Sequence, residues 1–295
     1  MTAPLQPQVR VRTWRPADPH GPRPHAADTD EAVSLLGDRP LVVLTGAGMS
    51  TDSGIPDYRG PGAPDRTPMT YQEFVSGPVP RQRYWARSHV GWRRMRAAVP
   101  NDGHRALAEV DPGLLVTQNV DGLHEAAGSR RVVALHGRID EVVCLDCDTL
   151  SARVALHERL EELNPGYADR HLTAETRPDG DVEVDDTAGF VVPPCDVCGG
   201  VLKPHVVFFG ETVPPERVAR CFDAVDALAD RDGALLVAGS SLTVMSGLRF
   251  VRRAAKAGNP VVVVNRGATR GDDVATATVE AGCTDFLRAL AAARG

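Results

Sequence analysis

The stretch that decides the fold reads LVVLTGAGMSTDSGIPDYRG and spans residues 41–60. Its first four residues are all apolar, which predicts a strand buried in a parallel sheet. Gly46 and Gly48 follow this strand, and residues without a Cβ allow a tight turn and the close approach of a ligand. Backbone N–H groups at the start of a following helix would then favour a phosphate. The stretch therefore predicts a strand and loop that bind a nucleotide.

Two features separate this stretch from the usual dinucleotide-binding fingerprint. The fingerprint has a third glycine where Thr51 stands, and an acidic residue about twenty positions further on at the end of a second strand. Asp65, the acid nearest that spacing, lies in a loop rich in Pro and Gly. An ordinary NAD dehydrogenase is therefore a disfavoured interpretation.

Length and composition exclude several classes of protein. The chain has 295 residues, enough for one large domain or a large and a small one, and its net charge of −6 argues against a general nucleic-acid surface. No apolar run approaches the roughly eighteen residues of a membrane helix, and no signal peptide is expected. Ala, Arg and Asp are abundant, as in high-GC bacteria. We expect a monomer without nucleic-acid or membrane partners, located in the cytoplasm, or in mitochondria if the source is eukaryotic.

Polar residues follow the other apolar runs of the chain. These runs, at 114–117, 132–135, 235–238 and 261–264, predict further buried strands. The residues that follow them are Gln118, Asn119 and Asp121, then His136, then Gly239, Ser240 and Ser241, and finally Asn265. Open α/β sheets bind ligands at the carboxyl ends of their strands. We therefore expect these side chains to line one site.

His136 is the candidate catalytic base of this site. A lone histidine is more often structural, but this one ends a strand beside two other polar strand ends. The ordinary pKa of imidazole lies near neutrality, so His136 could accept a proton at working pH.

The alternation of strands and helices predicts an α/β fold with a doubly wound, parallel, Rossmann-like sheet and a smaller inserted domain. We assign the chain as follows: residues 1–30 a disordered tail; 31–60, 103–140 and 205–295 the Rossmann-like domain; 61–102 a helical insert; 141–204 a zinc-binding insert. In the helical insert, aromatic residues among arginines are compatible with nucleic-acid binding. The favoured alternative is a helical lobe with Trp85 and Trp92 buried and the arginines solvated.

Four of the six cysteines form two Cys-x-x-Cys pairs, which predict a metal site. The pairs are Cys144 with Cys147 and Cys195 with Cys198. Two such knuckles supply four thiolates to a tetrahedral Zn²⁺, whereas a redox dithiol needs only one pair. Because four cysteines leave no open coordination position, the zinc is expected to be structural. Of the other two cysteines, Cys221 lies at helical spacing from Val218, Phe222 and Val225 and is expected to belong to the hydrophobic core.

The run from Lys203 to Glu211 is apolar and strand-like, and returns the chain to the main fold. It predicts either an ordinary core strand or an apolar groove with a free edge, to which an extended peptide could add. The groove residues would be Val207, Phe208, Phe209, Gly210 and Glu211.

Taken together, these motifs resemble those of the sirtuins, the Sir2 family of NAD-dependent protein deacylases. The resemblance covers about residues 31–292 and rests on Gly46-Ala-Gly-Met-Ser50, Gly54-Ile-Pro-Asp-Tyr-Arg59, Thr117-Gln-Asn-Val-Asp-Gly-Leu-His124, His136-Gly137, both cysteine pairs, Val206-Val-Phe-Phe-Gly-Glu211 and Gly239-Ser-Ser241. Tyr58, the 81–92 stretch and residues 128–131 and 144–147 are similar to the class II branch. That branch includes a mitochondrial sirtuin for which lipoamidase and ADP-ribosyltransferase activities are described. The sequence departs from the family at His205, where an Asp is common.

The resemblance implies an enzyme that uses NAD as co-substrate and holds one structural zinc. It implies acyl-lysine proteins as substrates, and free lysine, nicotinamide and O-acyl-ADP-ribose as products. His136, Asn119 and Asp121 would be catalytic, with His136 as general base on a ribose hydroxyl. NAD would be held by Gly46, Ala47, Gly48, Ser50, Ile55, Pro56, Asp57, Tyr58, Arg59, Gln118, Asn119, Asp121, Gly239, Ser240, Ser241, Asn265, Arg266, Gly267 and Cys283.

Two alternatives remain open at this point. Mono-ADP-ribosyl transfer to a protein, or removal of lipoyl groups, would use the same NAD site. A non-catalytic NAD sensor is disfavoured, because mere binding does not require a base such as His136. The acyl group preferred by the enzyme is not readable from the residues.

Overall fold

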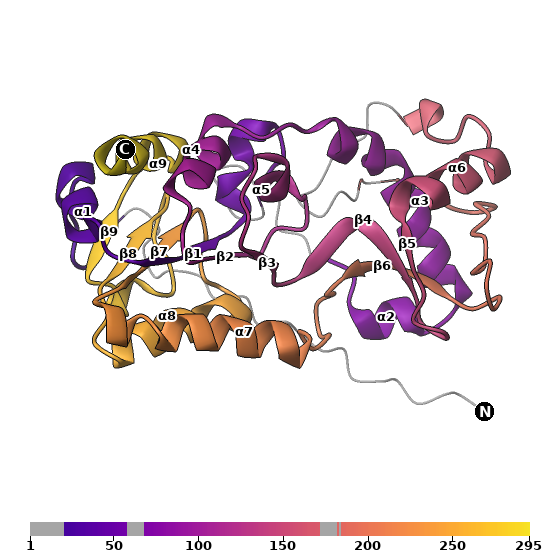
Figure 1. Ribbon diagram of the computed structural model, residues 1–295. Helices are drawn as coiled ribbons and strands as arrows, with labels where there is room; N and C mark the ends of the chain where they lie inside the picture. Colours follow the sequence, from indigo (N-terminus) through magenta and orange to yellow (C-terminus); the bar gives the residue numbers. More distant parts are fainter. Residues whose placement is uncertain (1–20, 58–67, 172–181, 183) are drawn as a thin grey trace.

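A six-stranded, all-parallel sheet forms the centre of the larger part of the molecule, which we call the large domain (Figure 1). The computed structural model describes residues 21–57, 68–171, 182 and 184–295. The strand order is β3-β2-β1-β7-β8-β9. The strands are β1 Leu41–Thr45, β2 Leu114–Thr117, β3 Val132–Ala134, β7 Ala234–Ala238, β8 Val261–Val264 and β9 Ala277–Val279. The predicted doubly wound sheet is confirmed.

Helices cover both faces of this sheet, so its central strands are apolar along their whole length. One face carries α7 (Pro215–Asp226) and α8 (Met245–Lys256); the other carries α1 (Thr29–Leu36), α4 (Asp102–Val110) and α9 (Cys283–Arg294) (Figure 1). In β1, Val42 and Leu44 pack with the first group, whereas Leu41 and Val43 pack with the second. Side chains alternate across a strand, so each face of β1 meets a separate core. Cys221 lies fully buried in the first core, as expected.

The direction of winding reverses between β1 and β7. The chain proceeds from β1 outward through β2 to β3, and later from β7 outward through β8 to β9. Strands β1 and β7 are nevertheless neighbours, with Thr45 opposite Ala238. Such a switch point leaves a crevice at the carboxyl ends of the two strands, where ligands of this architecture bind.

The smaller part, which we call the small domain, combines the two inserts around one core. Its antiparallel sheet has the order β5-β4-β6, and its helices lie against that sheet (Figure 1). The elements of the small domain are α2 Tyr71–Val75, α3 Pro78–Ala97, β4 Gly137–Cys144, β5 Leu150–Ala152, α6 Arg153–Leu163 and β6 Leu202–Val206. The short helix α5, Leu123–Ala126, belongs to the large domain. Trp85 of α3 is fully buried there and donates its indole N–H to the carbonyl of Leu202, 3.0 Å away. Trp92 is also buried while Arg93 and Arg94 are exposed, as the helical-lobe interpretation expected.

Several local expectations are corrected. The run from Lys203 to Glu211 is a strand only as far as Val206, and β6 pairs with β4 in the small sheet. Gly210 then takes a φ of 80°, and the N–H of Glu211 bonds to the carbonyl of Phe208, which closes a turn. The last helix begins at Cys283, with Gly282 as its N-cap, and the hydroxyl of Thr284 donates to Asp52 at 2.6 Å.

The expected disordered tail over residues 1–30 is wrong for residues 21–30. Ala26 forms a parallel bridge with Thr278 of β9, and helix α1 begins at Thr29 behind a capping box formed by Asp28 and Glu31. Arg23 is buried against Asp272, 2.9 Å away. This ion pair and the backbone bridge hold the segment on the edge of the sheet. Residues 1–20 lie outside the described residues.

Within the described ranges, no helix is long and apolar enough to cross a membrane.

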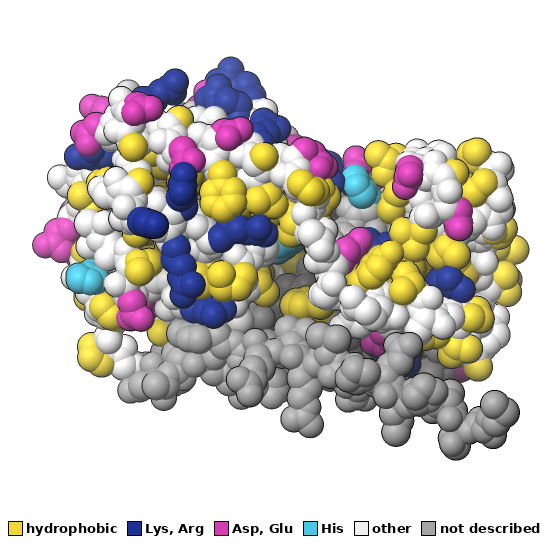
Figure 2. Space-filling view, turned by 90° about the horizontal axis from the view of Figure 1, so that it is seen from below, with side chains coloured by type: hydrophobic (Ala, Val, Ile, Leu, Met, Phe, Trp, Pro, Cys, Tyr) yellow, Lys and Arg dark blue, Asp and Glu magenta, His cyan; other side chains and the backbone are white. Residues whose placement is uncertain are grey.

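Lysine and arginine side chains gather on the face formed by α7 and α8 (Figure 2).

Candidate functional site

Two glycine loops pack against each other at the switch point. A Cβ on Gly46 would lie 2.8 Å from the carbonyl oxygen of Gly239, and one on Gly48 would lie 3.0 Å from the Cα of Gly239. Gly239 itself has a φ of 67°, which a side chain rarely tolerates. The sequence analysis attributed these glycines to ligand approach. The structure adds that the contact between the β1 and β7 loops itself excludes larger residues.

The segment after β1 is not the α-helix that we expected. It consists of two short 3₁₀ turns, Ala47–Met49 and Thr51–Ser53. Gly48 donates its N–H to the carbonyl of Gly239 at 2.9 Å. The backbone N–H groups that could bind an anion therefore belong to one tight loop and not to the first turn of an α-helix.

Ser50, Asn119 and Asp121 form one hydrogen-bonded cluster, although they come from loops after two different strands. The hydroxyl of Ser50 donates to the carboxylate of Asp121 at 2.7 Å and accepts from the amide of Asn119 at 2.9 Å. The same amide also donates to the carbonyl of Gly46 at 3.0 Å. The polar side chains predicted to meet at the sheet edge are thus brought together, in a fixed arrangement.

A second set of bonds links Gln118, Ser240 and His136. The hydroxyl of Ser240 donates to the side-chain oxygen of Gln118 at 2.6 Å. The backbone carbonyl of Gln118 lies 2.9 Å from Nδ1 of His136, and the hydroxyl of Ser246 lies 2.8 Å from Nε2. Because a carbonyl only accepts, Nδ1 carries the proton and Nε2 accepts from Ser246. The imidazole therefore presents an unprotonated Nε2.

The pKa of His136 is lowered from 6.5 to about 4, mainly by burial, and the positive charges of Arg249 and Arg217 contribute to this shift. The bond to the Gln118 carbonyl acts in the opposite direction without reversing the shift. At neutral pH the imidazole is neutral, which is the form that a general base requires.

The expected groove residues begin next to His136. Val207 donates its N–H to the carbonyl of His136 at 2.7 Å. Glu211 accepts from the N–H of Phe208 at 2.8 Å and pairs with the buried ammonium of Lys203 at 3.0 Å. The ammonium also lies 4.8 Å from the centre of the Phe208 ring. The run is therefore fixed from beneath by Lys203, while Phe209 and Gly210 bond to helix α2.

The loop of Ile55, Pro56 and Asp57, which was expected to hold part of NAD, lies between the two domains. Ile55 is buried against Trp92, Leu123 and Ile139, whereas Pro56 is exposed and Asp57 half-buried. Tyr58 and Arg59 lie outside the described residues, so their expected roles stay predictions.

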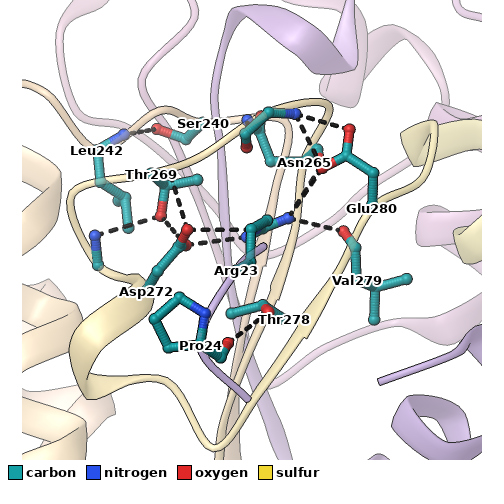
Figure 3. Close-up of polar contacts among 12 residues, drawn as sticks. Arg23, Pro24, Ser240, Leu242, Asn265, Thr269, Asp272, Thr278, Val279 and Glu280 are labelled. Carbon is teal, nitrogen blue, oxygen red and sulfur yellow. Dashed lines mark hydrogen bonds and ion pairs between the residues drawn. The ribbon is translucent and has the colours of Figure 1, made fainter. Parts of the chain in front are cut away.

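The loop from Asn265 to Asp272 forms the opposite end of the crevice and is held by Arg23 (Figure 3). The guanidinium of Arg23 donates to the Asp272 carboxylate at 2.9 and 3.0 Å and to the carbonyls of Asn265 and Val279 at 3.1 and 3.0 Å. The side-chain amide of Asn265 donates to the carbonyls of Arg266 and Gly267, at 2.9 and 2.8 Å. Asn265 therefore shapes its own loop.

Cys283 and Ser241 complete the expected list. Cys283 is buried, and a Cβ on Gly239 would lie 2.8 Å from its sulfur. Ser241 bonds to the hydroxyl of Thr243 at 3.0 Å. Both therefore border the β7 loop at the same crevice.

The four paired cysteines converge in the small domain. All four sulfurs lie within 4.8 Å of one another; Cys144 and Cys198 are 3.5 Å apart, and Cys147 and Cys195 are 3.9 Å apart. A tetrahedral Zn²⁺ with Zn–S bonds of about 2.3 Å separates its sulfurs by roughly 3.8 Å. The cluster therefore fits a structural zinc site, as the spacing predicted.

Three residues near the site were missed by the sequence analysis. Ser246 contacts the candidate base but lies at the start of a helix without a distinguishing pattern, and Arg23 lies in a Pro-rich segment. His205, noted only as a departure, bonds to Glu141 at 2.7 Å and accepts from Arg217 at 3.2 Å. It therefore joins β4 and β6 of the small domain to helix α7 of the large one.

The fold and this edge of the sheet define a nucleotide-binding α/β protein with a zinc-ribbon insert and a neutral histidine at the carboxyl ends of the strands. The Sir2 family model matches residues 46–246, which is more than half of the chain. The chain therefore belongs to the Sir2 family. Its membership of the class II branch stays a prediction.

Named relatives and solved structures agree with this assignment. The chain is 52% identical over 272 residues to NAD-dependent protein deacetylase 1 of Mycobacterium avium (strain 104), covering 90% of this chain and 95% of that protein. It is 58% identical over 247 residues to NAD-dependent protein deacetylase 1 of Streptomyces coelicolor, covering 81% of each. A solved structure described as "Sir2-p53 peptide-NAD+" matches with a TM-score of 0.70 and 30% identity, covering 90% of this chain and 97% of that one.

Proposed function

We propose that the chain is an NAD-dependent protein lysine deacylase that gives free lysine, nicotinamide and O-acyl-ADP-ribose. The observation that carries the proposal is His136: its tautomer is fixed by the Gln118 carbonyl, and its Nε2 is unprotonated. Binding alone would not need such a base. Relatives more than 50% identical over most of the chain are named as deacetylases.

The residues around the crevice fit NAD as co-substrate. The close packing of Gly46, Gly48 and Gly239 holds the half-buried backbone of Ala47 and Gly48 at the edge that a pyrophosphate would approach, and the loop from Asn265 to Gly267 would hold the adenosine end. The half-buried Gln118, Asn119 and Asp121 would orient the ribose next to nicotinamide. When bound, NAD supplies the ribose that receives the acyl group as nicotinamide leaves.

The chain's own residues would perform three tasks. Nε2 of His136, which accepts a hydrogen bond from the Ser246 hydroxyl in this structure, would instead accept one from a ribose hydroxyl and take up its proton. The Ser50–Asn119–Asp121 cluster holds its hydrogen bonds in place before substrate arrives, so little reorganisation is required. The apolar run from Val207, tied to His136 by a backbone bond, would take the acyl-lysine side chain and exclude water.

The test is product analysis with full-length protein, NAD and a panel of peptides that carry acetyl-, succinyl-, lipoyl- or longer acyl-lysine. We expect free lysine peptide and O-acyl-ADP-ribose in equal amounts by mass spectrometry, and the panel identifies the preferred acyl group. ADP-ribose attached to protein would instead identify a mono-ADP-ribosyltransferase. Nicotinamide release with no peptide of the panel deacylated would contradict the proposal, and binding of NAD without turnover would identify a sensor.

A further inference from the structure

A second cluster of metal-ligand residues lies in the small domain and forms a group separate from the four cysteines. It consists of His89 on α3 and of His157 and Glu161 on α6. One ligand atom from each residue lies within 4.8 Å of the other two.

The helices bring the three side chains together. His157 and Glu161 are four residues apart on α6 and therefore share one face of that helix. The ring of His89 approaches from α3, with its centre 4.6 Å from the centre of the His157 ring. The cluster thus spans the seam between the helical insert and the cysteine-containing insert.

His89 is the unusual member, because it is a fully buried imidazole whose two ring nitrogens make no hydrogen bond within the described residues. Its Nε2 lies 3.1 Å from the Glu161 carboxylate, but without hydrogen-bond geometry. Nδ1 of His157 and the same oxygen of Glu161 are likewise buried without hydrogen bonds in the described chain. A buried polar atom without a partner is destabilising because nothing replaces its lost hydrogen bonds to water, so such convergence calls for an explanation.

The charges around the cluster partly oppose a cation. The guanidinium of Arg93 lies 3.7 Å from Glu161, although it also pairs with Asp169 at 2.5 Å. The buried guanidinium of Arg153 lies 5.1 Å from the ring centres of both Trp85 and Trp92. These neighbours weaken a cation site, so its affinity should be well below that of four thiolates. Burial, with help from Arg153, lowers the pKa of His89 and of His157 to about 4, which leaves both imidazoles in the neutral form that binds metals.

We propose that His89, His157 and Glu161 bind a divalent transition-metal ion, with Zn²⁺ as the expected occupant, and so clamp α3 to α6. Two imidazoles and one carboxylate are a known ligand set for zinc, and water would complete the coordination. Bonds of about 2.0–2.2 Å allow ligand atoms at most about 4.4 Å apart. Only a small rotation of the side chains is therefore required.

The experiment counts zinc in the untagged, full-length protein. The protein is dialysed against buffered Zn²⁺, and zinc per chain is measured by mass spectrometry of the metal. We expect two zinc ions per chain in the wild type and one in His157→Gln and in Glu161→Gln. In calorimetric titration, each variant should bind the second zinc at least tenfold more weakly, and added Zn²⁺ should raise the Tm of the wild type only.

His171→Gln is the matched control, because this histidine lies in the same insert but outside both metal groups. It should take up two zinc ions like the wild type. A wild type that retains one zinc after dialysis would overturn the proposal. So would a second zinc that His157→Gln and Glu161→Gln bind as tightly as the wild type, since that ion would sit elsewhere.

Discussion

His136 in the large domain and His89 in the small domain are both sheltered imidazoles with a pKa lowered to about 4, yet their surroundings differ. His136 has a hydrogen bond at each ring nitrogen, and the donor and acceptor are fixed by a carbonyl. His89 has none among the described residues and faces another histidine and a carboxylate instead. A bonded imidazole with one settled tautomer suits proton transfer, whereas convergent unbonded nitrogens suit a metal ion. The same low pKa therefore serves two different chemistries.

The largest effect is expected from removing the imidazole of His136. His136→Ala should lower deacylation by about 10²–10⁴-fold at saturating NAD, because general base catalysis contributes that much. The zinc content should stay at the wild-type number, which separates this histidine from His89. Deacylation rates and metal counts on the same preparation test both statements.

His171→Gln controls for the loss of an imidazole as such and should keep the wild-type rate. Near wild-type turnover of His136→Ala would refute the assignment of the base. Loss of zinc from His136→Ala would contradict the contrast between His136 and His89, since it would show that the catalytic site and the metal site depend on each other.

A smaller effect is expected from acid. Because the pKa of His136 is lowered to about 4, Nε2 stays unprotonated as the pH falls through 6.5. At pH 5.5 a histidine with the ordinary pKa would be roughly 10% neutral, whereas His136 would remain almost wholly neutral, a difference of about tenfold in available base. The profile of kcat/KM against pH should therefore have its acid limb below pH 5.

Such a profile reports the ionisation of the free enzyme, and so tests the burial of His136 before substrate binds. An acid limb centred near 6.5, with the protein still folded by circular dichroism, would show that solvent reaches the imidazole more freely than in the structure.

The smallest effect is expected at Ser246, whose hydroxyl bonds to Nε2 in place of a substrate hydroxyl. A neutral hydrogen bond contributes about 0.5–1.5 kcal/mol, so Ser246→Ala should change kcat by less than about tenfold. It should raise the pKa of His136, because the bond that it removes favours the neutral ring, and so move the acid limb upward. The pH profile of the variant beside the wild type provides the measurement. A loss approaching that of His136→Ala would mean that Ser246 takes part in the reaction itself.

Much of the large domain could be predicted because its signals are local. Four-residue apolar runs mark the buried strands, and polar residues directly after them mark the ligand edge. The cysteine spacing likewise predicted the convergence of four sulfurs. In each case neighbours in the sequence carry the information, and the parallel sheet then brings the strand ends together.

The missed features depend on residues that are distant in the sequence. His157 and Glu161 share a helical spacing, but only the packing of α3 on α6 adds His89 to them. The two inserts share one core, in which Trp85 bonds to Leu202. The spacing of apolar residues along the sequence does not predict this contact. The turn after Val206 was misjudged because the apolar run continues beyond the point where pairing with β4 ends.

The ion pair between Arg23 and Asp272 affects the choice of the residue at which the expressed protein should begin. A shortened version beginning at β1 would keep every motif of the family but would lack Arg23, and the Asp272 carboxylate would then keep its bonds to Thr269 within the same loop but lose its ion pair with the N-terminal segment. Such a truncation would make the 265–272 loop less ordered and would leave the surroundings of His136 unchanged. Expression work that aims at an intact binding groove should therefore retain the chain from Gly21 onward.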